Sequence, residues 1–310
     1  METKKVLVMG GNGYIGRNIV KAFSARNETA DVYDLFPAGN DTHFYQGNVR
    51  DDEKLDEIIS RYDSLIYLIS SVSPKKSMDA PESAYVNDIP MLIKVLDSCV
   101  RSGCKRVIFA SSGGTVYGEG EGRVLSEDSY CQPINHYAIC KEASEKILLM
   151  YNQRYGMENV ILRVSNPYGQ GQNPKSGVGA ITIFSRKALA DEEITLYADP
   201  DTVRDYINVF DVAEAFYQAV YYDFDKDVIP VFNIGSGIGF SLKDIIAIIA
   251  DTLNKEVCVQ VVESRGYDVK YNVLDIEKAQ KYLSYGKHED EEDRIREYIL
   301  KLKEENGWRK

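Results

Sequence analysis

Gly10-Gly11-Asn12-Gly13-Tyr14-Ile15-Gly16 lies between an apolar run at residues 5–9 and a helical pattern at residues 15–26. Three of its glycines (Gly10, Gly13 and Gly16) meet the demands of a dinucleotide-binding turn: a tight bend, backbone approach to a pyrophosphate, and close packing of helix on strand. The pyrophosphate binds at the helix N-terminus, where unpaired amides and the helix dipole favour negative charge. A glycine-rich loop alone is weak evidence, but here the strand and the helix are both present. We therefore predict a dinucleotide site that also includes Tyr14 and Ile15.

Outward from this loop, short apolar runs alternate with amphipathic segments. Strands are predicted at 5–9, 30–34, 42–46, 64–69, 106–110 and 160–164, and helices at 15–26, 52–61, 82–101 and 136–155. Such alternation indicates a parallel sheet covered by helices on both faces, and continuous apolar runs suit strands that are buried on both sides. The sequence therefore predicts an α/β fold with a Rossmann-type, doubly wound parallel sheet.

The pattern changes after about residue 167, where glycine and proline become frequent and the predicted strands shorten. Helices are expected at 210–222 and 242–253, and a charged amphipathic helix packs on the surface within 287–310. We predict a dinucleotide-binding domain of residues 1–166, to which residues 205–234 return. Residues 167–204 and 235–310 would form a smaller, mixed α/β substrate-binding lobe.

Composition excludes several classes of partner. The chain has 310 residues, of which 44% are hydrophobic, and a formal net charge of −11. Nucleic acids and anionic membrane surfaces would be repelled, so a phosphate-bearing ligand must meet local donors. Neither a membrane span nor a leader is expected, because residues 1–5 run straight into the first strand. The five cysteines, without a C-x-x-C pair, and three scattered histidines predict neither a disulfide framework nor a metal site, and reduced thiols suit the cytoplasm.

Asp34 closes the second predicted strand, about 20 residues after the glycine loop, where a carboxylate accepts from both ribose hydroxyls of a dinucleotide. That carboxylate would repel the additional phosphate of NADP, so NAD is the favoured cofactor. The alternative is an aspartate that only stabilises the turn.

Tyr137 and Lys141 are four residues apart in Tyr-Ala-Ile-Cys-Lys, which places them on one face of the predicted helix 136–155. A tyrosine that exchanges protons near neutral pH needs a lowered pKa, and an ammonium group one turn away supplies the favourable charge. Among 22 tyrosines a chance pair is possible. The position on the helix that follows the strand 106–110 favours the catalytic interpretation.

At this point the chain resembles the extended short-chain dehydrogenases/reductases of the nucleotide-sugar epimerase/dehydratase family, and the match covers nearly its whole length. The stretches that carry the resemblance are Gly10–Gly16, Gly47-Asn48-Val49-Arg50-Asp51, Asn87, Ser111-Ser112-Gly113-Gly114-Thr115-Val116-Tyr117-Gly118, Tyr137 with Lys141, Arg163-Val164-Ser165-Asn166-Pro167-Tyr168-Gly169, Arg204-Asp205-Tyr206 and Phe232-Asn233-Ile234-Gly235.

The resemblance implies a role for each of these stretches. Tyr137 and Lys141 would be catalytic, and the further cofactor contacts would come from Asn48, Val49, Leu68, Ile69, Ser70, Asn87, Ser111, Gly113 and Ser165. The sugar nucleotide would be bound by Asn166, Arg204, Arg265 and Asn272, of which the two arginines offer forked, permanently charged donors to the diphosphate. For Arg204 the alternative is an ion pair with a neighbouring aspartate.

Two stretches depart from the family pattern. Gly113 occupies the position where family members usually carry the Ser or Thr that contacts the reacting oxygen of the sugar. Ser112 and Thr115 are the candidates for the missing hydroxyl, and otherwise Tyr137 would act with water. Residues 68–72 differ from the usual small apolar residues and from the lysine of many 4-epimerases.

Several reactions are compatible with this site. Dehydratases of the family need acidic residues just after the Thr, where this chain has Gly114 and Thr115, so a UDP-sugar 4-epimerase is favoured. A 4-ketosugar reductase, a dehydratase and a non-catalytic NAD-binding regulatory protein remain alternatives. Asn272 falls at the position that gates N-acetyl groups and leaves hexose and N-acetylhexosamine open. By resemblance, the helices 82–101 and 136–155 would form a homodimer.

Overall fold

A seven-stranded sheet forms the core of the computed structural model, which describes residues 3–37, 42–174, 177–262, 269–286 and 290–305. All neighbouring strands in it are parallel. In spatial order the strands are β11 (Val231–Ile234), β7 (Val160–Val164), β5 (Arg106–Ser112), β4 (Ser64–Tyr67), β1 (Val6–Met9), β2 (Ala30–Asp34) and β3 (Phe44–Gln46). The predicted Rossmann-type parallel sheet is confirmed.

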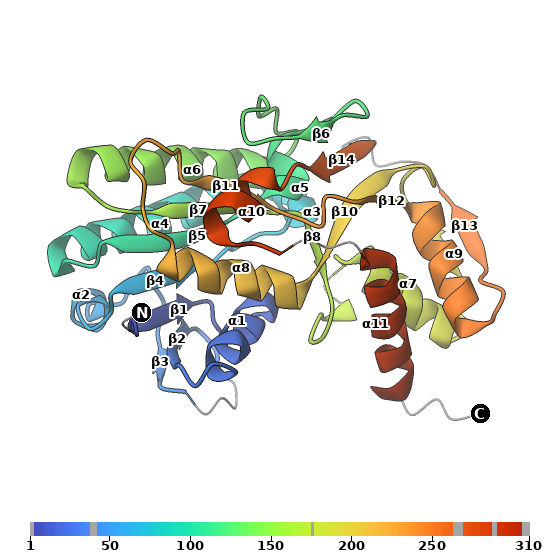
Figure 1. Ribbon diagram of the computed structural model, residues 1–310, viewed down its shortest axis with the longest axis horizontal. Helices are drawn as coiled ribbons and strands as arrows, with labels where there is room; N and C mark the ends of the chain where they lie inside the picture. Colours follow the sequence, from blue (N-terminus) through green and yellow to red (C-terminus); the bar gives the residue numbers. More distant parts are fainter. Residues whose placement is uncertain (1–2, 38–41, 175–176, 263–268, 287–289, 306–310) are drawn as a thin grey trace.

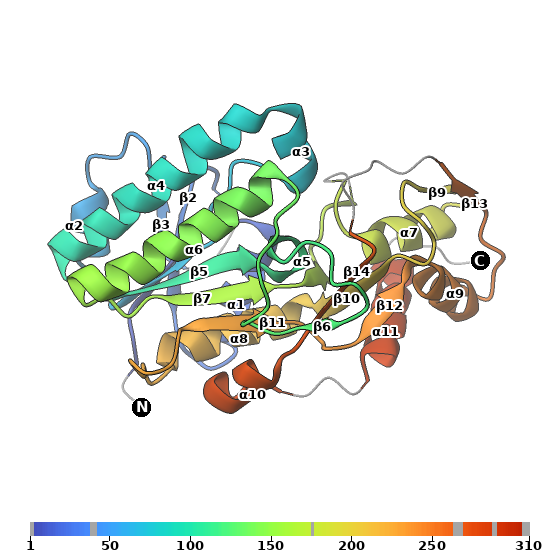
Figure 2. The same cartoon turned by 90° about the horizontal axis from the view of Figure 1, so that it is seen from above.

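Helices cover both faces of this sheet (Figure 2). One face carries α1 (Tyr14–Ser24) and α8 (Val209–Tyr221), and the other carries α2 (Leu55–Ile59), α4 (Pro81–Ser102) and α6 (His136–Tyr155). In β1 the side chains of Val6 and Val8 join the apolar cluster under α1 and α8, whereas Leu7 and Met9 join the one under α4 and α6. β1 is therefore buried on both faces, which explains its continuous apolar sequence.

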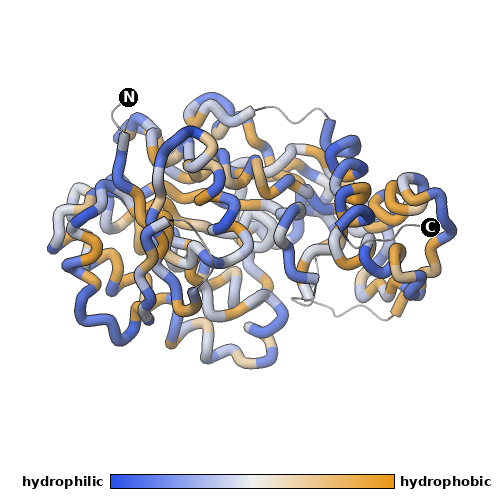
Figure 3. Tube along the Cα trace, turned by 90° about the horizontal axis from the view of Figure 1, so that it is seen from below, coloured by the Kyte–Doolittle hydropathy of each residue, from blue (hydrophilic) through white to orange (hydrophobic). Residues whose placement is uncertain are grey.

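The smaller lobe surrounds a third apolar cluster at one end of the molecule (Figure 1). Its helices are α7 (Ala180–Leu189), α9 (Leu242–Leu253) and α11 (Glu291–Glu305), beside the two-stranded pair β9 (Ile194–Leu196) and β13 (Val259–Val261). A second sheet joins the lobes and contains β12 (Gly239–Ser241), β10 (Val203–Asn208), β14 (Tyr271–Leu274), β6 (Val124–Leu125) and β8 (Asn166–Tyr168). Figure 3 shows hydrophobic segments inside both lobes and hydrophilic ones at their edges.

The return to the main sheet begins later than the expected residue 205. β10 pairs with β8, β12 and β14, although its Ile207 packs in the apolar cluster of the main sheet, and β11 pairs with β7 of that sheet. The strand continues into α8 without a loop because Asn208 caps the helix by accepting the Phe210 N–H at 3.0 Å.

Three short helices complete the fold: α3 (Pro74–Asp79), α5 (Gly113–Val116) and α10 (Glu277–Leu283). α3 and α5 lie near the start of α6, at the carboxyl end of the sheet, which is where ligands bind in open α/β sheets.

Candidate active site

A cavity of about 930 Å³ lies between the carboxyl edge of the main sheet and the smaller lobe. Residues from the glycine loop, β5, α6, α7, β9 and β10 line it. It brings together fifteen of the site residues inferred from sequence: Gly10, Gly13, Tyr14, Ile15, Gly16, Leu68, Ser70, Ser111, Ser112, Thr115, Tyr137, Lys141, Ser165, Asn166 and Arg204. The sequence did not indicate that α7 and β9 line the cavity. No local sequence pattern shows which face of an element in the smaller lobe will lie toward the main sheet.

The glycine loop has the shape that a pyrophosphate requires. Gly10 has a φ of +82°, and a Cβ on Gly16 would lie 2.6 Å from both the Gly10 carbonyl oxygen and the Gly11 Cα. Gly11, which sequence reasoning passed over, is equally constrained, since its Cβ would approach Val32 Cγ1 to 2.8 Å. The Tyr14 hydroxyl is buried without a hydrogen-bond partner among the described residues, so it is available to a ligand. These features fit a bound dinucleotide.

Asp34 is half-buried at the end of β2, and its carboxylate contacts the glycine loop. Oδ2 accepts the Asn12 N–H at 3.0 Å, and Oδ1 accepts the Phe36 N–H at 3.3 Å. The residue therefore does stabilise the local turn. A carboxylate has about four acceptor positions, so these two bonds leave room for ribose hydroxyls.

The start of α6 positions the tyrosine and the lysine. Asn135 caps the helix by accepting the Ala138 N–H at 2.9 Å, and the Tyr137 N–H donates to Ser77 Oγ at 3.1 Å. Lys141 Nζ donates to the Ala110 carbonyl oxygen at 2.8 Å and lies 5.5 Å from the centre of the Tyr137 ring. The two side chains therefore share one helix face and meet the end of β5.

Burial changes the protonation of both groups. It raises the pKa of Tyr137 to about 12, opposed by a hydrogen bond from the Ser112 side chain that favours the phenolate. It lowers the pKa of Lys141 to about 8, because the ammonium loses its hydration. Both pKa shifts result from burial in the site. The Tyr137 hydroxyl, which must lose a proton, therefore lies beside an amine whose pKa is near neutral pH.

The structure distinguishes between the two candidate hydroxyls. The Ser112 side chain interacts with Tyr137 closely enough to lower the pKa of the phenol. Thr115 Oγ1 instead donates to the Ser112 carbonyl oxygen at 3.5 Å. Gly113 does not line the cavity. A Cβ there would lie 2.6 Å from Leu274 Cδ1 and 2.8 Å from the Arg163 carbonyl oxygen, so the backbone leaves no room for a side chain.

A buried ion pair supports the floor of the site. Arg163 Nη2 lies 2.7 Å from Glu145 Oε2, and both side chains are almost fully buried. The Ser111 hydroxyl donates to the same carboxylate and so joins this network. Glu145 was missed in the sequence, although its position four residues after Lys141 places it on the same helix face.

Five other predicted residues lie away from the main cavity. Asn48 makes local bonds to Arg50 and Asp51, and Val49 is buried. Asn87 is half-buried on α4, and Ile69 borders a second, small cavity. Asn272 is fully buried and donates to the Gly113 carbonyl oxygen at 3.1 Å, so it does not reach the cavity as the expected gating residue would. Arg265 lies outside the described residues.

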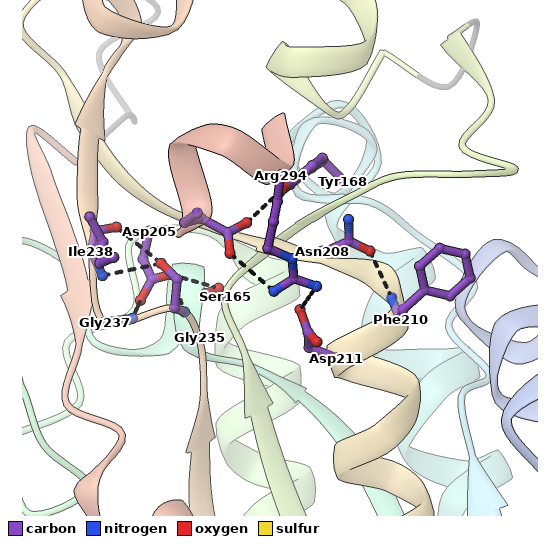
Figure 4. Close-up of polar contacts among 12 residues, drawn as sticks. Ser165, Tyr168, Asp205, Asn208, Phe210, Asp211, Gly235, Gly237, Ile238 and Arg294 are labelled. Carbon is purple, nitrogen blue, oxygen red and sulfur yellow. Dashed lines mark hydrogen bonds and ion pairs between the residues drawn. The ribbon is translucent and has the colours of Figure 1, made fainter. Parts of the chain in front are cut away.

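Asp205 connects β10 to the segment that follows β11 (Figure 4). Its buried carboxylate accepts the backbone N–H groups of Ser236 and Gly237 at 2.8 and 3.1 Å, and burial raises its pKa to about 6. Ser165 Oγ donates to it at 3.3 Å. Asn166 Nδ2 donates to its carbonyl oxygen at 2.8 Å. Arg204, whose Nη1 donates to the Val203 carbonyl oxygen at 2.9 Å, lines the cavity beside them.

Comparison with known families decides the relationship. Residues 6–235 match the model of the NAD dependent epimerase/dehydratase family. The chain belongs to this family. The predictions of the family and of NAD as its cofactor are thereby confirmed.

Similar proteins carry two different activities in their names. The chain is 30% identical to a dTDP-4-dehydro-6-deoxyglucose reductase of Escherichia coli over 92% of this chain and 94% of that protein. It is 29% identical to a UDP-glucose 4-epimerase of Halalkalibacterium halodurans over 90% of each protein. The crystal structure of Thermus thermophilus UDP-glucose 4-epimerase in complex with NAD superposes with a TM-score of 0.86 at 29% identity, covering 96% of this chain and 98% of that one.

Two further findings concern membrane-spanning helices and metal sites. No helix within the described ranges is long and apolar enough to cross a membrane. The same residues contain no group of three or more His, Cys, Asp or Glu side chains arranged to hold a metal ion.

Proposed function

We propose that this protein catalyses the NAD-dependent epimerisation of a UDP-sugar at C4, through transient oxidation to the 4-keto sugar. The observation that carries the proposal is the Ser112–Tyr137–Lys141 cluster, which lines the same cavity as the glycine loop. A proton-exchanging group thus lies beside the dinucleotide site, in a cavity large enough for a second ligand.

The residues of the chain would handle the proton. The Tyr137 phenolate accepts the proton of the C4 hydroxyl and returns it at the end of the cycle. Ser112 donates to the phenolate oxygen, and the Lys141 ammonium favours its negative charge. NAD, when bound, supplies a reversible acceptor for the hydride from C4. The protein would contribute orientation and electrostatics. Epimerisation also requires the keto sugar to turn over in the cavity, so that the hydride returns to its opposite face.

The substrate would be held from the other lobe. Asn166 and Arg204 line the cavity, and a guanidinium offers a fork of donors to a diphosphate in an otherwise acidic protein. Arg265 stays a prediction from the sequence. The similar epimerases are named for UDP-glucose, which supports a uridine nucleotide, and both hexoses and N-acetylhexosamines remain candidates.

A 4-ketosugar reductase is the second candidate, favoured by the similar Escherichia coli reductase. A reductase consumes one cofactor in each turnover, whereas an epimerase regenerates its own. The carboxylate of Asp34, which disfavours NADP, supports the epimerase. A dehydratase would need a carboxyl group at the start of α5, where Gly114 and Thr115 stand. The intact Tyr137–Lys141 pair argues against a non-catalytic NAD-binding regulator.

The test is a panel of nucleotide sugars, with products separated by chromatography and NADH followed by absorbance. We expect conversion of UDP-glucose and UDP-galactose, or of their N-acetyl forms, without net NADH change. Tyr137→Phe should lower kcat by at least about a hundredfold, the size of a general acid–base contribution. Tyr155→Phe, at the exposed end of the same helix, is the matched control. Full activity of Tyr137→Phe would refute the assignment, and net NADH consumption with a nucleotide-linked 4-ketosugar in the panel would favour the reductase.

The homodimer, the cytoplasmic location and the division into two domains stay predictions. α4 and α6 carry exposed apolar side chains, among them Val86, Ile139 and Met150, which support a dimer through these helices. The mass of the protein in solution would decide this point.

A further inference from the structure

Asp88 lies on α4, outside the set of residues that the sequence indicated, and accepts two hydrogen bonds from the loop after β4. Ser70 Oγ donates to its Oδ2 at 2.8 Å, and the Ser71 N–H donates to its Oδ1 at 2.8 Å. Ser70 also lines the main cavity. One carboxylate therefore connects α4 to the loop that borders the dinucleotide site.

The same carboxylate faces the catalytic helix. A small second cavity is lined by Asp88 and Lys141 together, with Cys140 and Ser144 of α6, Ile69 of the loop, and the aromatic side chains of Tyr67 and Phe109. Asp88 and Lys141 thus border one void behind the wall of the active site. The carboxylate of Asp88 raises the pKa of Lys141, as expected for opposite charges that border one void.

Asp88 and Glu145 both raise the pKa of Lys141, and Asp88 has the larger effect. Glu145, one turn further along α6, is paired with Arg163, and the β5 side contributes the neutral carbonyl of Ala110. Cys140 is a thiol whose pKa burial raises to about 11, so it is neutral at physiological pH. The two hydrogen bonds to Asp88 come from a hydroxyl and a backbone amide, which are both uncharged. They therefore do not neutralise the negative charge that Asp88 presents toward Lys141.

We propose that Asp88 is a positioning residue for the Tyr137–Lys141 pair. It ties the loop 68–72 to α4 and places a fixed negative charge behind the ammonium group of Lys141. The expected effect on kcat rests on the proposed epimerase function, whereas the expected effect on the pKa of Lys141 does not.

The sign of the effect follows from the charges. Asp88 raises the pKa of Lys141, opposing the burial that lowers it to about 8. Asp88 also raises the pKa of Tyr137, because a nearby carboxylate disfavours the phenolate. Removal of the charge lowers both values, so the whole pH profile of kcat moves toward acid.

The experiment compares the wild type with Asp88→Asn, which keeps the size and an acceptor oxygen but not the charge. Asp88→Glu is the conservative variant that should restore the effect. Asp97→Asn, on the same helix and bonded to the Tyr151 hydroxyl, is the matched control. Asp88→Ser substitutes for Asp88→Asn if that variant does not fold by circular dichroism. Trace acetylation of Lys141 with acetic anhydride, quantified by peptide mass spectrometry across pH, reports the titration of the amine without any need for turnover.

We expect the acetylation midpoint of Lys141 to fall by about one pH unit in Asp88→Asn, as for loss of an opposite charge at close range. The kcat profile should move in the same direction, while Asp97→Asn and Asp88→Glu keep the wild-type values. An unchanged Lys141 midpoint in Asp88→Asn would overturn the proposal. A wild type without epimerase activity would overturn the proposed function instead, and the acetylation titration would still decide the role of Asp88.

Discussion

Loss of the Ser112 hydroxyl should impair the proposed epimerase more than loss of the Thr115 hydroxyl. The Ser112 side chain interacts with the Tyr137 phenol and lowers its pKa, although burial, the larger effect, still leaves that pKa raised to about 12. A hydrogen bond to a charged group contributes about 1.5–3 kcal/mol. Ser112→Ala should therefore lower kcat roughly 10- to 150-fold, since each 1.4 kcal/mol is about a factor of ten.

Thr115→Val provides the comparison, because it removes a hydroxyl from the same cavity with little change of shape. Thr115 Oγ1 donates over 3.5 Å to the Ser112 carbonyl oxygen, a long contact for a hydroxyl. A bond of this quality contributes at most about 0.5 kcal/mol, so kcat should fall no more than about twofold.

The assay measures UDP-galactose conversion, coupled to UDP-glucose oxidation and followed by NADH absorbance across pH. In Ser112→Ala the acid limb of the kcat profile should move to higher pH, because the phenolate loses a donor that stabilised it. Thermal unfolding checks that both variants fold. Wild-type turnover in Ser112→Ala, or a larger loss in Thr115→Val, would refute the assignment of the hydroxyl.

Two further predictions concern cofactor choice and the lobe junction. Asp34→Ser should move the ratio of NADP to NAD affinity at least about tenfold toward NADP, because the carboxylate that repels the additional phosphate is removed. Fluorescence titration measures both affinities. An unchanged ratio would place the ribose contact at another residue. Burial raises the pKa of Glu291 to about 7 from 4.5, so the folded protein holds a proton that the unfolded chain releases between these pH values. The free energy of unfolding should therefore fall as pH rises through this window, and Glu291→Gln should gain on the order of 3 kcal/mol relative to the wild type between pH 4.5 and 8 in urea unfolding. Parallel pH curves for the two proteins would contradict this origin of the dependence.

Burial raises the pKa of Glu291 although two polar neighbours, Tyr168 and Arg294, act to lower it. Glu291 accepts the Tyr168 hydroxyl at 2.6 Å and lies 3.4 Å from Arg294 Nη1. The Arg294 guanidinium also pairs with Asp211 at 2.5 Å (Figure 4). Two carboxylates thus share one arginine across α8 and α11. Nothing in the local sequence of either helix indicates this arrangement, because the three charges come from segments about 80 residues apart.

The local sequence determined the features that depend on neighbours along the chain. The apolar run of β1, the glycine loop and α1 follow one another directly, so their contact needs no distant residue, and the structure has them together. Tyr137 and Lys141 share a face because helical periodicity alone places residues four apart side by side. The parallel sheet follows from strand–helix alternation in the same way.

Only the tertiary structure decided what depends on side-chain direction and on long-range packing. The choice between Ser112 and Thr115 rests on where β5 ends and α5 begins. The burial of Asn272 rests on the pairing of β10 with β14 at the junction of the lobes. Asp88 faces Lys141 because α4 and α6 pack together on the same face of the sheet. The periodicity of the sequence predicts which residues share one face of a helix or strand. Which element packs against that face depends on segments far apart in the sequence.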